Sequence, residues 1–444
     1  MGDNINMSRR NFILIVIILF TALAVFFAYL FMTRTTIDTS TTPEENLGFL
    51  SRINPFNTRP SSQTNSGDNN QPNEPVIEDE TPIIPESNLK QISSMPIAGY
   101  SIFQKEILLE TPTLETNTTE VAPVKTSKKV TPPKTEFVPM VRYVAKEDGN
   151  IFQSFLKNVE ERRFSNTVIP KIYEAFFGNS GQTVLMRYLK SDDKTIETFV
   201  GNLPKEILGQ EPVQNNEVKG TFLPENITSM SLSQDSSKLF YLFNVGEAGI
   251  GINYDLVSKK TQILNSPFTE WLSQYPNSKM ISLTTKPSGL VQGYMYKLDI
   301  GTKSLNRVLG GINGLTTLTS PNGKLIIFAD ANLSLNLYNI ETGETKSLGL
   351  RTIPDKCVWG KNSDMVYCAT PVSIPQATYP DSWYMGETSF RDQIWRIDIS
   401  TINTVLISSL SDATDAINLS LDQNEDYLLF INKNNSFLWE LSLK

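Results

Sequence analysis

The stretch that decides the fold is LTSPNGKLIIF, residues 318–328, because a similar stretch, SLSQDSSKLFY, occurs at residues 231–241. Each holds a short apolar strand, a polar turn and the start of a second apolar strand. Comparable second strands start at six positions separated by 40 to 62 residues, which are Thr183, Lys238, Lys279, Lys324, Asp364 and Asp426. Short strands and turns at a period of about forty residues are typical of a β-propeller.

Seven repeats of this kind can be counted along the chain. They begin at Ile97, Ile172, Asn226, Phe268, Asn313, Ile353 and Asp415. The last repeat supplies three strands, so we expect residues 88–93 to add its fourth strand and close the ring. Closure leaves no unpaired edge between the first and last blades. The sequence therefore predicts an all-β, seven-bladed propeller with four-stranded blades, with six or eight blades as alternatives.

An acidic or amide side chain recurs where the third strand of a repeat ends. The positions are Asp255, Asp299, Asn339, Asp398 and Glu440, and a polar turn follows the first four. An Asp or Asn oxygen can accept hydrogen bonds from the backbone amides of such a turn. We interpret these residues as structural rather than as metal ligands, because each repeat has only one and the repeats lie apart.

These motifs resemble the WD-repeat and TolB-like β-propeller families. The segments SPNGKL (320–325) and LYNIETG (337–343) are close to the TolB-like repeat. The resemblance covers residues 88–444 and departs from WD repeats because the Gly-His dipeptide is absent. The phrases RYV (142–144), NTVIP (166–170) and YPDSWY (379–384) look like uncharacterised membrane-anchored propeller proteins of candidate-phylum bacteria. That resemblance implies a cell-envelope location and gives no information on activity.

The amino end holds a run long enough to cross a membrane. Residues 12–32 contain no charged side chain, and as a helix they would span about 31 Å, the thickness of a bilayer core. The run exceeds the apolar part of a cleaved signal peptide, so we expect an uncleaved signal anchor. Arg9 and Arg10 precede it and Arg34 alone follows closely, which predicts a cytoplasmic amino end and an extracytoplasmic propeller. Both arginines lie in SRRNF, which also resembles a twin-arginine export signal, so the export route stays open.

Two segments have the composition of a linker. Residues 33–87 are rich in Thr, Ser, Asn and Pro, and from Thr35 to Ser87 nine acidic side chains face two arginines, a net charge of −7. Such a segment buries too little apolar surface to offset its ordering entropy, so we expect a disordered acidic tether. We expect a second disordered stretch at 105–136, an insertion in the first blade. The predicted order is a cytoplasmic tail (1–11), an anchor (12–32), a tether (33–87) and a propeller (88–444).

Composition excludes several kinds of chemistry. The 444 residues include no histidine and two cysteines, and the formal net charge is −8. Without histidine there can be no Ser-His-Asp or Cys-His catalysis and no His-containing zinc site. A negative chain also argues against nucleic acid as a partner. We find no motif for a catalytic residue, a cofactor or a metal ligand, and we expect none of the three.

The two cysteines, Cys357 and Cys368, fall on the first two strands of the sixth repeat. They face each other if Trp359 opposes Val366 in the hairpin, and directly opposed residues lie within disulfide reach. An exported domain also meets an oxidising compartment. We predict a disulfide, with two buried free thiols as the alternative.

The sixth repeat also carries the most unusual insertion, PVSIPQATYPDSWYMGETSFRD, at residues 371–392. We expect this insertion beside the mouth of the central channel. Aromatic side chains mixed with charges are typical of surfaces that contact proteins or sugars. The candidate binding surface consists of Tyr379, Trp383, Tyr384, Phe390 and Arg391. The alternative is an ordered lid that packs Trp383 onto neighbouring blades, and the two interpretations are compatible.

Together these patterns predict a membrane-anchored propeller outside the cell membrane. Its expected role is that of a non-enzymatic scaffold that binds an envelope protein or glycan. The alternative is a propeller hydrolase or lyase that acts on envelope polysaccharide. An enzyme of that kind needs at least two carboxylates that converge in one pocket, whereas a binder needs a broad aromatic surface.

Overall fold

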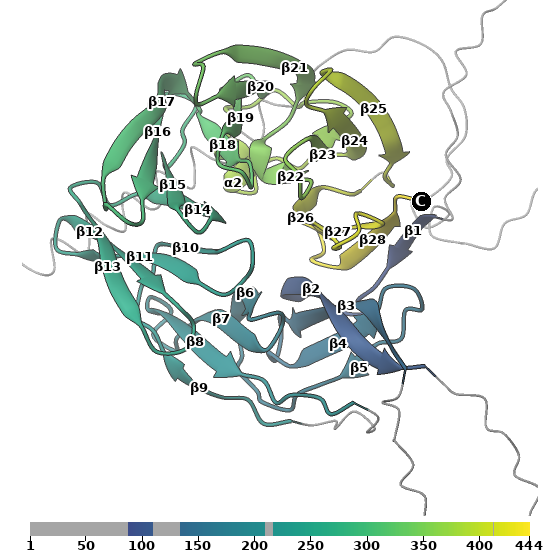
Figure 1. Cartoon of the computed structure of the whole chain (residues 1–444). Helices are drawn as coiled ribbons and strands as arrows, with labels where there is room; N and C mark the ends of the chain where they lie inside the picture. Colours follow the sequence, from purple (N-terminus) through teal and green to yellow (C-terminus); the bar gives the residue numbers. More distant parts are fainter. Residues whose placement is uncertain (1–87, 110–133, 209–215, 412) are drawn as a thin grey trace, which may run out of the picture. The chain divides into compact units, whose positions relative to one another are not determined.

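The computed structural model describes residues 88–109, 134–208, 216–411 and 413–444, which form seven antiparallel sheets arranged in a ring (Figure 1). The predicted anchor (12–32) and acidic tether (33–87) lie outside the described residues. Among the helices that the structure describes, none is long and apolar enough to span a membrane.

Each sheet has four strands and corresponds to one predicted repeat, so the seven-bladed propeller is confirmed. Blade one consists of β2 (Ile97–Leu108), β3 (Thr135–Ala145), β4 (Ile151–Phe155) and β5 (Arg162–Arg163), and blade two of β6 (Ile172–Gly178), β7 (Thr183–Leu189), β8 (Ile196–Asn202) and β9 (Lys219–Phe222). Blade three consists of β10 (Ser229–Leu232), β11 (Leu239–Val245), β12 (Ala248–Tyr254) and β13 (Lys260–Ser266), blade four of β14 (Trp271–Asn277), β15 (Met280–Thr285), β16 (Gln292–Asp299) and β17 (Leu305–Asn313), and blade five of β18 (Thr316–Thr319), β19 (Leu325–Ala329), β20 (Ser334–Asn339) and β21 (Thr345–Arg351). Blade six consists of β22 (Cys357–Trp359), β23 (Met365–Pro371), β24 (Asp392–Asp398) and β25 (Asn403–Ser409), and blade seven of β26 (Ala416–Leu421), β27 (Tyr427–Asn432), β28 (Leu438–Ser442) and β1 (Leu89–Gln91).

The ring closes as the sequence predicts. Strand β1 comes from the start of the described chain and pairs with β28 of blade seven, with Leu89 opposite Leu441 and Gln91 opposite Trp439. The backbone amide of Leu438 also donates to Ser93 Oγ at 2.9 Å. Blade seven is therefore completed by two segments from opposite ends of the propeller sequence.

The repeated turn explains why the two quoted stretches fold alike. Ser320 Oγ accepts the amide of Leu325 at 3.0 Å, and Ser233 Oγ accepts the amide of Lys238 at 2.9 Å. Each turn contains one residue with positive φ, Gly323 at 71° and Ser236 at 55°. Polar side chains that accept local amides favour such turns over regular strand.

The acidic corner residues behave as predicted at four of the five positions. Asp255 Oδ1 accepts three backbone amides of its turn at 2.9–3.0 Å, and Asp299, Asn339 and Asp398 accept turn amides in the same way. These hydrogen bonds lower the pKa of Asp255, Asp299 and Asp398. Glu440 is the exception, because it lies buried within β28.

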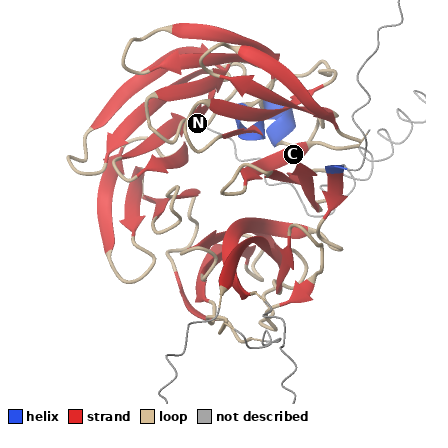
Figure 2. Ribbon diagram, turned by 45° about the vertical axis from the view of Figure 1, so that its right-hand side comes forward, coloured by secondary structure: helices blue, strands red, loops and turns tan. Residues whose placement is uncertain are grey.

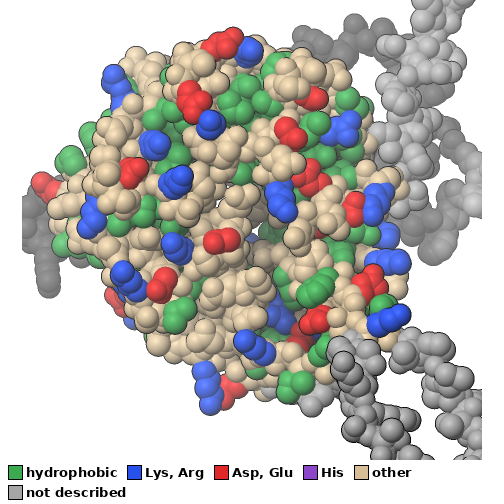
Figure 3. All heavy atoms as spheres, in the orientation of Figure 1, with side chains coloured by type: hydrophobic (Ala, Val, Ile, Leu, Met, Phe, Trp, Pro, Cys, Tyr) green, Lys and Arg blue, Asp and Glu red, His purple; other side chains and the backbone are tan. Residues whose placement is uncertain are grey.

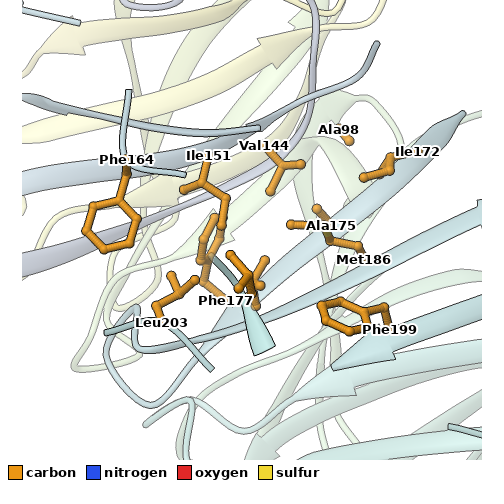
Figure 4. Close-up of a cluster of buried hydrophobic side chains, with 12 residues drawn as sticks. Ala98, Val144, Ile151, Phe164, Ile172, Ala175, Phe177, Met186, Phe199 and Leu203 are labelled. Carbon is orange, nitrogen blue, oxygen red and sulfur yellow. The ribbon is translucent and has the colours of Figure 1, made fainter. Parts of the chain in front are cut away.

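The hydrophobic core is divided among the seams between adjacent blades. Figure 4 shows the seam between blades one and two, where Val144 and Ile151 of blade one lie close to Phe177 and Met186 of blade two. A second such seam joins blade seven to blade one. Burying one aliphatic or aromatic side chain contributes about 1.5–3 kcal/mol, so the blades stabilise each other across every seam.

The order of strands within a blade defines two faces of the ring (Figure 2). Turns between the first and second strands, and between the third and fourth, lie on one face, which we call the hairpin face. Turns between the second and third strands, and the connections between blades, lie on the other face. We call this the insertion face, because residues 371–392 join β23 to β24 there. Both Asn88, before β1, and Lys444, after β28, lie on the hairpin face.

One predicted boundary is wrong. We expected a disordered insertion at 105–136, but β2 continues to Leu108 and β3 begins at Thr135, so the two strands pair over their full length, with Leu108 opposite Thr135. The reason is that an antiparallel ribbon can extend beyond its blade as long as its strands pair with each other. Residues 110–133 lie outside the described part of the chain.

The two cysteines lie opposite each other at the base of the insertion. Cys357 of β22 pairs with Cys368 of β23, and Trp359 pairs with Val366, in the predicted register. A disulfide joins the two sulfurs, and both residues are buried in the seam between blades five and six.

Candidate functional site

The insertion, residues 371–392, folds over three blades of the insertion face. It contains the short helix α2 (Asp381–Tyr384), which lies within the outline of the ring in Figures 1 and 2. Its apolar side chains form a cluster with Leu333 of blade five, Ile353 before blade six and Ile417 of blade seven. The segment therefore packs as an ordered lid, which was one of the two interpretations of the sequence.

Most of the predicted aromatic binding surface is not accessible. Tyr379, Trp383 and Phe390 are at most 5% exposed, because their rings pack against one another and against the blades below. The expectation that these three side chains form an exposed surface is thus wrong. Tyr384 is 40% exposed, and Arg391 is also exposed. Of the five predicted residues, these two remain on the surface.

Buried charges hold the insertion in place. Asp415, in the segment before β26, accepts hydrogen bonds from Trp383 Nε1 at 3.0 Å and from the Phe390 amide at 3.1 Å. Lys433, from the turn after β27, donates to the Trp383 carbonyl and lies 4.1 Å from the centre of the Trp383 ring. Burial lowers the pKa of Lys433. Blade seven therefore anchors an insertion that belongs to blade six.

The insertion also reaches blade four. The amide of Gly289, in the turn between β15 and β16, donates to Asp381 Oδ2 at 2.6 Å. A Cβ atom on Gly289 would lie 2.4 Å from the Tyr379 carbonyl oxygen, so only glycine permits this approach. On the other side of α2, Tyr384 donates to Asp355 Oδ2 at 3.0 Å. Helix α2 is therefore tied to blade four at one end and to Asp355, before β22 of blade six, at the other.

These contacts place four exposed side chains on one rigid support. Leu290 and Val291 follow Gly289 and are 83% and 62% exposed, while Tyr384 and Met385 at the end of α2 are 40% and 65% exposed. We call these four residues the apolar patch. The sequence analysis missed three of them, because their exposure depends on a contact between loops about ninety positions apart in the chain. The one signal in the sequence for part of this patch is the pair of consecutive aliphatic residues, Leu290 and Val291, in a turn.

A second concave site lies on the hairpin face, between blades one and two. It is a pocket of about 400 Å³ lined by the far end of β2 and by residues 204–208. Arg142 lies at its base and donates to Gln153, to the Gly181 carbonyl and to Glu206, and its guanidinium stacks on Phe103 and Phe164. Lys105 also pairs with Glu206. Arg142, Lys105 and Glu206 thus pair with one another, while Glu106 and Lys205 also line the pocket.

Acidic side chains occur at both sites. Asp392 and Asp415 are buried beneath the insertion, where Lys356 contacts both, and Glu106, Glu160 and Glu206 line the pocket. Part of Asp355 is exposed to solvent, but protein atoms surround its carboxyl group. The resulting loss of hydration raises the pKa of this carboxyl group. Figure 3 shows that the ring is hollowed near its centre and that charges of both signs are spread over its surface. Within the part of the chain that the structure describes, no group of three or more His, Cys, Asp or Glu side chains could hold a metal ion.

The fold and the site define a seven-bladed β-propeller whose sixth blade carries an anchored insertion. No protein-family model matches the chain, and neither does any curated protein.

Solved structures that resemble it include an oligogalacturonate lyase in complex with manganese, at 10% identity over 69% of this chain and 85% of the lyase, with a TM-score of 0.46. Another is the oligogalacturonate lyase of Vibrio parahaemolyticus, at 10% identity over 68% and 85% of the two chains, with a TM-score of 0.45. The tricorn protease matches at 11% identity over 66% of this chain and 27% of its own, with a TM-score of 0.34. We base no functional argument on these similarities, and the propeller assignment rests on the strand pairing.

Proposed function

We propose that this protein is a membrane-anchored, extracytoplasmic scaffold that binds an envelope protein through its apolar patch and catalyses no reaction. The observation that supports this function is the patch itself. Four apolar side chains are exposed on a support that blades four, six and seven hold rigid. A rigid support lowers the entropy lost on binding, which is why anchored apolar side chains are effective contact residues.

The positions of the chain ends agree with this role. Asn88 and Lys444 both lie on the hairpin face, whereas the apolar patch lies on the insertion face. The apolar patch and the residue at which the described propeller begins therefore lie on opposite faces of the ring. The proposed location is the outer side of the cell membrane.

A protein partner is favoured over a glycan. Sugar sites commonly use flat aromatic faces, and the rings of Tyr379, Trp383 and Phe390 are buried here. Leucine, valine and methionine, by contrast, are suited to the apolar centre of a protein interface. We keep the TolB-like or WD-repeat-like affiliation as part of the proposal, because the repeat motifs support it.

The test is affinity capture from native envelopes with the full-length chain. The patch variant carries Leu290→Ser, Val291→Ser and Met385→Ser, and the matched control carries Phe222→Ser, Val257→Ser and Val405→Ser at exposed positions elsewhere. We expect one protein to be retained by the parent and the control and lost by the patch variant. Equal capture by all three, with the variants folded, would contradict the proposal.

A propeller hydrolase or lyase acting on envelope polysaccharide is the alternative. One observation favours it: the raised pKa of Asp355 beside the Tyr384 hydroxyl, which is a property of general acids. The test is turnover of envelope polysaccharides by the parent and by Asp355→Asn. Turnover lost at least about a hundredfold in the variant would support the enzyme, and absence of turnover in the parent would exclude it for those substrates.

A further inference from the structure

Beneath the insertion lies a group of three charged side chains that the proposed function does not use. Lys356 precedes β22, Asp392 begins β24 and Asp415 precedes β26, and all three are 0% exposed. Lys356 Nζ lies 2.7 Å from Asp392 Oδ2 and contacts Asp415 Oδ1. Among the described lysines, Lys356 is the one that is fully buried.

Aromatic rings cover these charges. Lys356 Nζ lies 5.5 Å from the ring centres of both Trp383 and Phe390. Charges in such surroundings lose the stabilisation that water would give them, and the loss is several kcal/mol for each ion. An amide has no net charge and is less costly to bury. Joining the amine to one carboxyl group would therefore remove one positive and one negative charge from a low-dielectric site.

The two carboxyl groups have different surroundings. Asp415 Oδ2 accepts hydrogen bonds from Trp383, Ser389 and Phe390, so this carboxylate is held firmly by donors. Asp392 Oδ2 accepts the Ala416 amide at 2.6 Å as well as Lys356, whereas Asp392 Oδ1 is buried without a hydrogen-bond partner. Burial raises the pKa of Asp392 to about 6. Oδ2 is therefore the oxygen that Lys356 is placed to protonate and that would leave as water, and Oδ1 would become the oxygen of an amide.

We propose that Lys356 and Asp392 form an intramolecular amide cross-link, with Asp415 as the proton carrier. One proton of the Lys356 ammonium group moves to Asp392 Oδ2, which Nζ contacts, and the free amine then attacks Cγ of Asp392. The Nζ–Cγ bond forms, and a second nitrogen proton passes to Oδ2 through Asp415, which also contacts Nζ. The Cγ–Oδ2 bond breaks, so one ammonium and one carboxylate become one amide and one water.

The surrounding groups fit these steps. The Ala416 amide donates to Oδ2 and so fixes the carboxyl group of Asp392 beside Lys356 Nζ. Lys356 contacts both carboxyl groups before the reaction, so the reacting atoms are already close. The new bond would join positions 36 residues apart and enclose the disulfide hairpin together with the insertion. The support of the apolar patch would thereby be covalently closed at its base.

The test is mass spectrometry of the full-length protein after reduction of the disulfide and denaturation. We expect a mass about 18 Da below that of the sequence, which is the loss of one water. Digestion is expected to yield a branched peptide that joins Lys356 to Asp392. Lys356→Met and Asp392→Ala should restore the full mass, Asp415→Asn should slow the loss, and Lys324→Met, at an exposed lysine that pairs with Glu341, should not change it.

Three results would overturn the assignment. One is a parent protein with the full sequence mass after prolonged incubation near pH 6. Another is a branched peptide that ends on Asp415, which would exclude Asp392 as the acceptor. The third is a loss of water that persists in Lys356→Met, which would place the dehydration at another residue. The branched peptide is measured on the parent, so the test does not depend on the folding of a variant.

Discussion

At the scale of single residues, the alignment of Glu440 with the corner Asp or Asn of the other blades is wrong. The strand pairing puts Ser442 at that position, opposite Tyr427, as Asp398 lies opposite Met365. Glu440 lies two residues earlier inside β28, 1% exposed, and its Oε2 has no hydrogen-bond partner. Burial raises its pKa to about 7. The folded protein therefore binds a proton at Glu440 more tightly than the unfolded chain does.

We predict that Glu440→Gln stabilises the protein at pH 8 and not at pH 4. A raised carboxyl pKa contributes stability below the ordinary pKa near 4.5, and this contribution is lost as the pH rises toward 7. The cost at pH 8 is about 2–3 kcal/mol, and glutamine removes it without adding a charge. Denaturant unfolding at both pH values measures the effect, with exposed Glu387→Gln as the control. A variant that is destabilised equally at both pH values would refute this account.

At the scale of elements, the hairpin of β22 and β23 combines two constraints. Its strands pair in an antiparallel ladder, and the disulfide joins Cys357 to Cys368 across that ladder, 11 positions apart in the chain. Lys356 precedes the hairpin and the insertion follows it, so the hairpin is the base from which the site is built.

Replacing both cysteines by alanine should lower the free energy of unfolding by about 2–3 kcal/mol. A cross-link that closes a loop of this length restricts the unfolded chain by roughly that amount. Unfolding in denaturant under oxidising conditions measures the difference. The parent protein in reductant should unfold at the same denaturant concentration as the variant. Equal midpoints for the oxidised parent and the variant would contradict this expectation.

At the scale of the whole ring, stability depends on the seam that joins the last blade to the first. Ile92 is 3% exposed and packs with Ile97 and Val141 of blade one and with Leu429 and Leu438 of blade seven. Ile92 lies directly after β1, so a single residue near the start of the propeller connects both ends of its sequence.

We predict that Ile92→Ala lowers the free energy of unfolding by about 2–4 kcal/mol, because it leaves a cavity in a shared core. Hydrogen exchange should report lost amide protection in both β2 and β28. Val405→Ala, at a more exposed position on the outer strand of blade six, is the control and should change little. Loss of protection in blade seven alone would mean that the seam does not couple the two blades.

Sequence reasoning succeeded where the information was periodic. The starts of the blades, the closing strand, four of the five corner residues and the cysteine register all follow from short patterns with repeated spacing, and the structure has each of them. It was undecided where the outcome depended on one loop meeting another. An exposed surface and a packed lid both stayed open for Tyr379, Trp383 and Phe390, because nothing in residues 371–392 shows that blades five and seven cover them.

The sequence by itself determined the number of blades and the way the ring closes, since both depend on local strand and turn preferences that recur along the chain. It also predicts the anchor and tether, which fall outside the described residues. Only the tertiary structure decided which side chains face solvent on the insertion face and that Lys356, Asp392 and Asp415 meet beneath it. Lys356 and Asp392 belong to blade six and Asp415 precedes the first strand of blade seven, so their contact requires these two blades to pack against each other.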